Sequence, residues 1–139
     1  MKSIRNIIAF MAIGATVFLA SCAKDENDPT GTGDVRDKFT GTWTCNENSQ
    51  QQGNSTYSMT IVKDPGSASQ VIATNFYALG SSTNTYIGIS GNNMSISTQN
   101  PTATVTVSGS GSYSNGNLSF SFSADDGQTV DQVTVNAHH

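Results

Sequence analysis

Apolar side chains alternate with small polar ones along most of this chain, and that pattern restricts its fold more than any other feature. Met59 and Ile61 are separated by a threonine, and Phe120 and Phe122 by a serine. Successive side chains of a β-strand point to opposite faces, so such segments form strands with one apolar and one polar face. The pattern recurs at Trp43 and Cys45, Tyr57 to Ile61, Met94 and Ile96, Ala103 to Val107, Leu118 to Phe122, and Val133 and Val135.

The alternation predicts about eight strands, and no window shows helical apolar periodicity of useful length. We expect strands over residues 40–48, 56–63, 69–78, 84–90, 93–98, 102–113, 117–124 and 128–137. Short turn sequences separate several of them: Asp64-Pro65-Gly66, Gly91-Asn92-Asn93, Asn115-Gly116 and Asp126-Gly127. These residues tolerate positive φ or preset a turn, so neighbouring strands should pair antiparallel in a meander.

An all-β meander of about eight strands with one polar face can close into a barrel, which removes exposed strand edges. A two-sheet β-sandwich is the alternative. Gly109 and Gly111 suit a sharp bend or bulge at a barrel corner, or a strand that changes sheets in a sandwich. Residues 71–79 are apolar on both faces, which predicts either cover by residues 35–39 or an exposed patch that contacts a partner.

The N-terminus has the pattern of a secretory signal. Lys2 and Arg5 precede an uncharged run from Ile7 to Leu19, which matches the basic and apolar regions of a signal peptide. The run is too short to span a bilayer, because a transmembrane helix needs about 20 apolar residues. We therefore interpret residues 1–21 as a cleaved signal and not as a membrane anchor.

Leu19-Ala20-Ser21-Cys22 resembles the lipobox of bacterial lipoproteins, in which the cysteine thiol is acylated before the signal is removed. The resemblance implies that Cys22 is the lipidation site and that the mature chain is attached to a membrane through its N-terminal lipid. Acylation of Cys22 would leave Cys45 without an intramolecular partner. Cys45 shares a strand face with Trp43, which predicts a buried, inert thiol.

The segment from Lys24 to Asp28 resembles the acidic export tag that lipoproteins of the Bacteroidota carry behind their cysteine. The resemblance implies an outer-membrane location, either facing the periplasm or exposed at the cell surface. A solvated linker is the plainer interpretation of the same residues, and the two are compatible. The predicted organisation is a signal over residues 1–21, a flexible acidic tether over 22–35 and a folded domain over 36–137.

The segment Asp37-Lys38-Phe39-Thr40-Gly41-Thr42-Trp43 resembles the start of a lipocalin-type barrel, where a short helical turn leads into a first strand with Gly-x-Trp. In that family the tryptophan closes one end of the barrel, which implies the same role for Trp43. Further similarity is to small Bacteroidota outer-membrane lipoproteins with a lipocalin-like domain and no established activity. It rests on Asn75-Phe76, residues 87–92, Gln99 and Gly109-Ser110-Gly111.

An eight-stranded barrel is wide enough either to be filled by side chains or to hold one small ligand. The residues expected to line the interior, and therefore to contact a ligand, are Trp43, Tyr57, Met59, Phe120 and Phe122. We predict a lipid-anchored, non-enzymatic, lipocalin-like domain that binds a small apolar ligand. The alternative is a structural or interaction subunit of an envelope complex, with a solid barrel whose outer face docks to another envelope protein.

The folded part offers no catalytic or metal-site pattern. The two histidines are the last two residues, which we expect to be a frayed tail or a tag remnant. Their position excludes Ser-His-Asp and most zinc schemes. Asp125, Asp126 and Asp131 form an acidic cluster that we expect to be a solvated turn. Hydrolysis would require these acids to converge with Glu47 in one cleft. No catalytic residue, metal or cofactor is therefore predicted.

Net charge restricts the partners. The full chain has a formal net charge of −4, and the loss of Lys2 and Arg5 with the signal makes the mature chain more acidic. Nucleic-acid binding needs a basic stripe that neutralises phosphates. Nucleic acid is therefore excluded as a partner.

Overall fold

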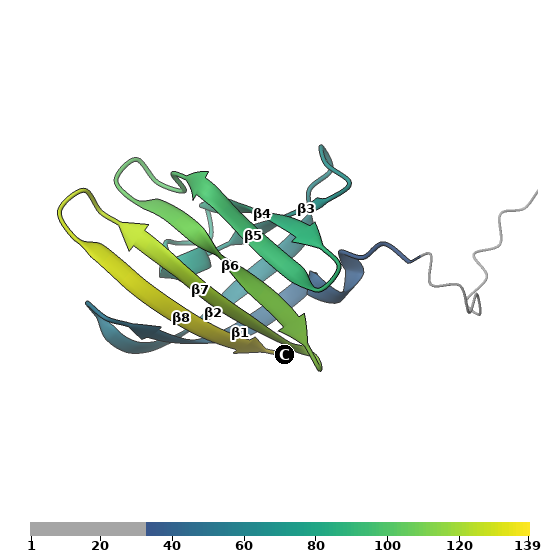
Figure 1. Cartoon of the computed structure of the whole chain (residues 1–139), viewed down its shortest axis with the longest axis horizontal. Helices are drawn as coiled ribbons and strands as arrows, with labels where there is room; N and C mark the ends of the chain where they lie inside the picture. Colours follow the sequence, from purple (N-terminus) through teal and green to yellow (C-terminus); the bar gives the residue numbers. More distant parts are fainter. Residues whose placement is uncertain (1–32) are drawn as a thin grey trace, which may run out of the picture. The chain divides into compact units, whose positions relative to one another are not determined.

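A computed structural model of the chain shows eight antiparallel strands that follow one another around a closed barrel (Figure 1). The structure describes residues 33–139, so the predicted signal, Cys22 and most of the predicted tether lie outside the described residues. The strands are β1 (Gly41–Ser49), β2 (Gly53–Lys63), β3 (Gln70–Thr74), β4 (Asn84–Ser90), β5 (Asn93–Gln99), β6 (Thr106–Ser114), β7 (Asn117–Asp125) and β8 (Val130–His138). The predicted antiparallel meander barrel is confirmed, and the β-sandwich alternative is wrong.

Pairing of the first strand with the last closes the barrel. β1 pairs with β2 from Gly41 opposite Ile61 onward, and its other edge pairs with β8, where Ser49 lies opposite Val133. Because successive strands run in opposite directions, every second connection between strands lies at the same end of the barrel. We call the end where β1 begins the closed end, and the end with the β1–β2 and β7–β8 turns the open end.

The turn residues have the backbone that the sequence predicts. Asn115 and Gly116 both have positive φ, at 50° and 80°, which matches a two-residue hairpin turn. Gly91 and Gly127 also have positive φ, at 60° and 84°. These compact connections join β4 to β5, β6 to β7 and β7 to β8, which confirms the predicted hairpins.

The third predicted strand is too long. β3 ends at Thr74, and the chain then turns into the short 3-10 helix η2 (Phe76–Ala78). Asn75, Tyr77 and Ala78 have φ values of 59°, 55° and 54°, a left-handed backbone that cannot continue a strand. The apolar character of this segment on both faces has a simple origin, because Phe76 turns into the barrel instead of lying on a strand face.

Two further strand boundaries differ from the prediction by three or more residues. β6 begins at Thr106 instead of residue 102, because Pro101 has no N–H to donate and the Thr102 hydroxyl bonds the backbone N–H of Val105 (3.1 Å). β2 begins at Gly53, earlier than expected, because the β1–β2 turn is tight.

Gly109 and Gly111 let β6 lie close against β7. A Cβ on Gly109 would lie 2.4 Å from the Cβ of Phe122, and one on Gly111 would lie 2.5 Å from the carbonyl oxygen of Ser119. The β6–β7 register is continuous at both glycines, so no bulge lies on the β7 side of β6. The register shift of β6 lies on its other side, against β5 between Ile96 and Gln99.

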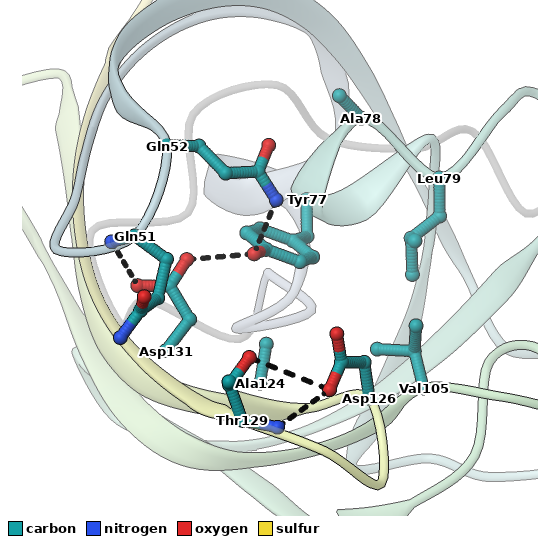
Figure 2. Close-up of a pocket in the computed structure, with 10 residues that line it drawn as sticks. All are labelled: Gln51, Gln52, Tyr77, Ala78, Leu79, Val105, Ala124, Asp126, Thr129 and Asp131. Atoms are coloured by element: carbon teal, nitrogen blue, oxygen red, sulfur yellow. Dashed lines mark hydrogen bonds between the residues drawn. The ribbon is translucent and has the colours of Figure 1, made fainter.

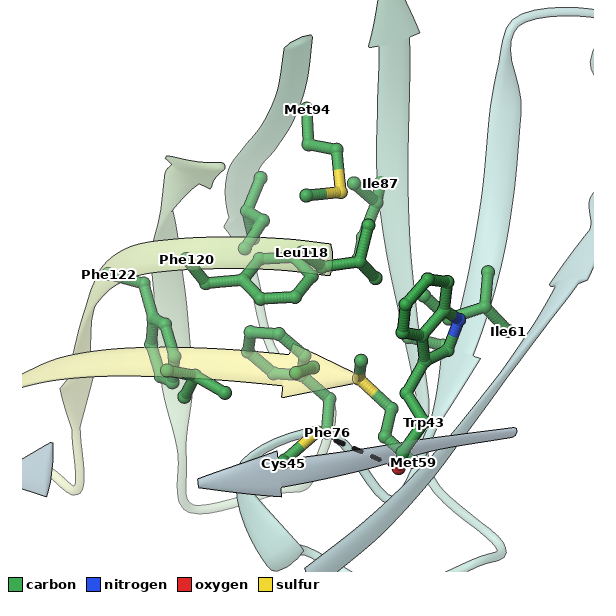
Figure 3. Close-up of a cluster of buried hydrophobic side chains, with 14 of the residues drawn as sticks. Trp43, Cys45, Met59, Ile61, Phe76, Ile87, Met94, Leu118, Phe120 and Phe122 are labelled. Atoms are coloured by element: carbon green, nitrogen blue, oxygen red, sulfur yellow. Dashed lines mark hydrogen bonds between the residues drawn. The ribbon is translucent and has the colours of Figure 1, made fainter. Parts of the chain in front are cut away.

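The barrel interior is packed with apolar side chains (Figure 3). Phe76 lies at its centre, with its ring 5.7 Å from that of Phe120 and 4.6 Å from that of Phe122. The other large, fully buried apolar side chains include Phe39, Trp43, Met59, Ile61, Ile87, Leu118, Val71, Val107, Val133 and Val135. This inward set contains most of the alternating residues predicted from the sequence.

Aromatic side chains seal the closed end. Trp43 is fully buried and its Nε1 donates a hydrogen bond to the carbonyl oxygen of Phe39 (2.9 Å). Phe39 ends the 3-10 helix η1 (Asp37–Phe39) and packs edge-on against Tyr113, with ring centroids 5.7 Å apart. The expected frayed tail is wrong for His139, whose ring lies over Trp43 at 3.8 Å. The expected role of Trp43 in closing the barrel is confirmed.

The outer face is mostly polar, and its exposed apolar side chains are one row and the separate Val130. Val62, Ile72 and Tyr86 are direct cross-strand partners on β2, β3 and β4, and Val62 and Tyr86 are about half exposed. Phe39 turns into the closed end, and Val35 is half exposed. Of residues 71–79 only Ile72 belongs to this row, while Val71, Ala73 and Phe76 are buried in the core. Among residues 33–139, no helix is long and apolar enough to cross a membrane.

Candidate functional site

A pocket of about 480 Å³ lies at the open end, between the β1–β2 turn, η2 and the β7–β8 hairpin (Figure 2). This volume falls within the range of small-molecule sites, roughly 300–1,000 Å³. Apolar side chains form one part of the wall and polar ones the other. The lining residues are Gln51, Gln52, Tyr77, Ala78, Leu79, Val105, Ala124, Asp126, Thr129 and Asp131.

Asp131 is the buried acid of this pocket, with an exposed fraction of 3%. It lies on the same face of β8 as Val133, so strand alternation turns its side chain inward. Its Oδ2 accepts hydrogen bonds from Ser49 Oγ (2.5 Å) and Tyr77 Oη (2.7 Å). Its Oδ1 accepts a third from the backbone N–H of Gln51 (3.1 Å). Three donors from different segments therefore hold one carboxylate in the wall.

These donors keep Asp131 ionised. Burial raises the pKa of Asp131, but the hydrogen bonds from Ser49, Tyr77 and Gln51 outweigh burial, and the pKa lies below its usual value. The expectation that this acid belongs to a solvated turn is wrong, because the turn ends before β8 and places Asp131 inside the barrel. Asp125 and Asp126 are exposed, as expected.

Tyr77 connects η2 to the pocket wall. Its hydroxyl donates to Asp131 and accepts a hydrogen bond from Gln52 Nε2 (3.0 Å). Its ring packs edge-on against Phe122, with centroids 5.7 Å apart. A bulky residue with positive φ is uncommon and costs of order 1–3 kcal/mol, and such strain is concentrated at functional sites. Segment η2 therefore has a strained backbone, which places Phe76 in the core and Tyr77 in the pocket wall.

A second buried acid, Glu47, lies on β1 one inward position before Ser49. Its Oε1 accepts a hydrogen bond from Ser55 Oγ (3.3 Å), while its Oε2 and the nearby Tyr57 hydroxyl have no hydrogen-bond partner. Burial is the main cause that raises the pKa of Glu47, with the negative charge of Asp131 adding to it, and the Tyr57 and Ser55 hydroxyls oppose the rise. The two buried acids thus have pKa values displaced in opposite directions.

Cys45 is a free, fully buried thiol in the next inward layer. Burial raises its pKa to about 12, and the negative charge of Glu47 acts in the same direction. The thiolate is the reactive form of cysteine, so this thiol is inert in the folded protein at neutral pH. The predicted burial of Cys45 is confirmed.

All five predicted interior residues face inward, but none lines the open-end pocket. Trp43, Met59, Phe120 and Phe122 are buried in the packed core, and Tyr57 is partly buried against it. The space between them is occupied by Phe76, which sequence reasoning assigned to a strand. Its position depends on the left-handed backbone of its neighbours, for which a lone asparagine before Phe76 is the only local signal.

The acids considered for hydrolysis converge only in part. Asp126 and Asp131 line the same pocket, whereas Glu47 lines a different one and Asp125 lines neither. Asp126 is engaged at the turn, where its Oδ1 accepts hydrogen bonds from the backbone N–H groups of Gln128 (2.9 Å) and Thr129 (2.7 Å). Within residues 33–139, no group of three or more His, Cys, Asp or Glu side chains is arranged to hold a metal ion.

Fold and pocket together define an eight-stranded antiparallel β-barrel that has a packed interior, is sealed at one end and has a pocket at the other. No protein-family model and no curated protein sequence matches this chain. Among solved structures, the chain is similar to a redesigned β-barrel, b11L5F_LGL, with a TM-score of 0.53 and 16% identity over 78% of this chain and 96% of that one. It is also similar to EF1p2_mFAP2b bound to DFHBI, with a TM-score of 0.50 and 13% identity over 76% and 97% of the two chains. These similarities show the barrel fold alone.

Proposed function

We propose that this chain is a lipid-tethered, non-enzymatic binding protein whose barrel holds a small ligand at its open end. The observation that carries the proposal is the pocket of about 480 Å³ above a fully packed core. Its wall combines Leu79, Val105 and Ala124 with the polar groups of Tyr77 and Asp131. An apolar wall with a few convergent polar groups is the usual composition of a small-molecule site.

Because the interior is filled by side chains, we expect the ligand above the core. Phe76 occupies the centre of the barrel and contacts the rings of Phe120 and Phe122. An apolar part of the ligand would therefore rest on Leu79, Val105 and the Tyr77 ring, beside the acid. The strained backbone at Tyr77 supports this assignment, because such strain is found at ligand clamps.

Native mass spectrometry of the chain, purified from its own cell envelope in mild detergent, tests the ligand. We expect a bound small molecule in the wild-type protein and its loss in Val105→Trp, which fills the pocket. Val130→Trp is the matched control, because Val130 is half exposed and does not line the pocket. A wild-type protein that is consistently empty, or a ligand that persists in Val105→Trp, would contradict the proposal.

The membrane attachment rests on the N-terminal residues. We propose that residues 1–21 are removed, that Cys22 is acylated, and that residues 22–35 tether the barrel to the outer membrane. Cys22→Ala should abolish palmitate labelling and leave the unprocessed precursor, and labelling that persists would refute the assignment. Protease added to intact cells would degrade a surface-exposed barrel and spare a periplasmic one.

One observation favours a second candidate function. Val62, Ile72 and Tyr86 form an apolar row on a mostly polar outer face, as an interaction subunit with a solid barrel would require. A photo-crosslinker at Tyr86 in intact cells should then capture one envelope protein, whereas the same group at Ser121 on the far outer face should not. Equal labelling from both positions would count against this function.

A further inference from the structure

The cationic side chains of the described chain lie at one end of the barrel, where two of them pair with acids. The lysine and arginine residues of the described chain are Arg36, Lys38 and Lys63, and all three lie at the closed end. Arg36 donates to backbone carbonyls of the β2–β3 connection, and Lys38 donates to the side chain of Asn92 in the β4–β5 turn. Lys63 pairs with Asp34 at 3.2 Å. These three side chains have their partners at the closed end, and the pocket lies at the opposite end of the barrel.

The open end is acidic. Asp126 and Asp131 line the pocket, and among residues 33–139 no lysine or arginine lines it. The three donors to Asp131 come from two hydroxyls and a backbone amide, which are uncharged. A buried negative charge is usually balanced by a positive one. The pocket wall therefore holds an ionised carboxylate whose balancing charge is not supplied by the described chain.

Glu47 is a second buried acid, and its negative charge adds to the acidic character of this end of the barrel. Its side chain is 6% exposed and inward-facing, in the layer directly beneath Ser49, which bonds to the pocket acid Asp131. Neither its Oε2 nor the Tyr57 hydroxyl has a hydrogen-bond partner. Buried polar atoms without partners are rare in native proteins, and each needs an explanation, such as a bound donor. The Tyr57 hydroxyl is itself an O–H donor that lowers the pKa of Glu47, so this layer presents one donor and one acceptor without a hydrogen-bond partner.

The arrangement of these acceptors suits an organic cation better than a metal ion. The described acids do not form a group of three or more metal ligands, so a divalent ion would lack its coordination shell. Beside the acids, the wall offers the Tyr77 ring and the apolar side chains of Leu79 and Val105. An aromatic face attracts a cation, and apolar side chains favour a hydrocarbon body. An ammonium group attached to a small apolar body would match both parts of the wall.

We propose that the ligand of this pocket is a small amphipathic amine, whose ammonium group binds Asp131 while its apolar part packs on Leu79, Val105 and Tyr77. This inference rests on the proposed ligand-binding function and names its ligand class. The ammonium group donates to the unused acceptor capacity of the Asp131 carboxylate.

Three probes that share one phenyl group test the charge requirement: 2-phenylethylamine, 2-phenylethanol and phenylacetate. Each is titrated into the full chain in detergent, with the backbone amide signal of Gln51 as reporter, because this N–H donates to Asp131. We expect the amine to bind about tenfold or more tightly than the alcohol, and the anion not to bind. Asp131→Asn should remove the preference for the amine. Asp125→Asn, on the same hairpin but outside the pocket, should retain it.

The possible results separate this inference from the proposed function. If the alcohol binds as tightly as the amine, or if Asp131→Asn retains the preference, recognition of an ammonium group is wrong while the pocket stands as a ligand site. If none of the probes shifts the Gln51 signal, the inference is also overturned, and the proposed function is then decided by the native mass spectrum. The comparison of the three probes in the wild-type protein needs no variant, so a folding defect of Asp131→Asn cannot obscure it.

Discussion

The two buried acids should have opposite effects on the pH dependence of stability. Asp131 is 3% exposed and accepts hydrogen bonds from Ser49, Tyr77 and the Gln51 backbone. Replacing it by asparagine keeps the volume and removes the charge. A hydrogen bond to a charged group contributes about 1.5–3 kcal/mol, and one between neutral groups about 1 kcal/mol. After the smaller cost of burying a neutral amide is allowed for, the net loss at neutral pH is about 2 kcal/mol.

The size of this loss should depend on pH. Because the pKa of Asp131 is lower in the folded protein than in the unfolded chain, where it is about 3.9, its ionised form stabilises the fold fully above about pH 5. That contribution is lost as the pH falls through 3.9 toward the folded pKa. The difference in unfolding free energy between wild type and Asp131→Asn should therefore shrink in acid.

Glu47 should behave in the opposite way. Burial raises its folded pKa above the unfolded value of about 4.3, so the folded protein retains a proton that the unfolded chain has released. The free energy of unfolding is then reduced as the pH rises from about 4.3 through the folded pKa. Glu47→Gln has no charge to bury, so it should be as stable as wild type in acid and more stable than wild type at neutral pH.

Urea denaturation of the three proteins between pH 3 and pH 8, followed by Trp43 fluorescence, measures these differences. At neutral pH a loss of about 2 kcal/mol would lower the Tm of Asp131→Asn by about 10 °C. Parallel pH profiles for wild type and Asp131→Asn would refute the account of Asp131. A Glu47→Gln protein that is less stable than wild type at neutral pH would show that the Glu47 carboxylate is favourably bound and not merely buried.

Three further predictions concern packing. Gly109→Ala should lower the free energy of unfolding by about 3 kcal/mol, because its Cβ would lie 2.4 Å from atoms of β7, whereas Gly33→Ala, with open space around it, should be neutral in the same urea assay. Cys45 should react with a thiol reagent only at the rate of global unfolding, because it is fully buried with a pKa of about 12, and rapid labelling of the native protein would contradict this burial. His139→Ala should shift Trp43 fluorescence to longer wavelength by uncovering its ring, and an unchanged spectrum would show that the stacking is absent in solution.

The alternation of apolar and polar residues was enough to predict the barrel, because each strand and each hairpin turn is defined by residues that are neighbours in the sequence. Alternation at Leu118, Phe120 and Phe122 needs only neighbouring residues to define an inward face, and Asn115-Gly116 needs only its own backbone to define a hairpin. Each strand of a meander pairs with the next one in the chain, so local signals also determine the order of the strands.

The candidate site was less predictable, because it depends on contacts between segments far apart in the chain. Asp131 looks like part of a polar turn until Ser49, the Gln51 backbone and Tyr77 are brought to its carboxylate from other segments. Phe76 looks like a strand residue until the chain turns at a left-handed backbone and places its ring in the lumen. The amino-acid sequence by itself determined the eight strands, their inward faces and their order. The tertiary structure alone decided that the interior is filled, that the pocket lies at the open end, and that its acid is buried, because these properties arise only when distant segments share one space.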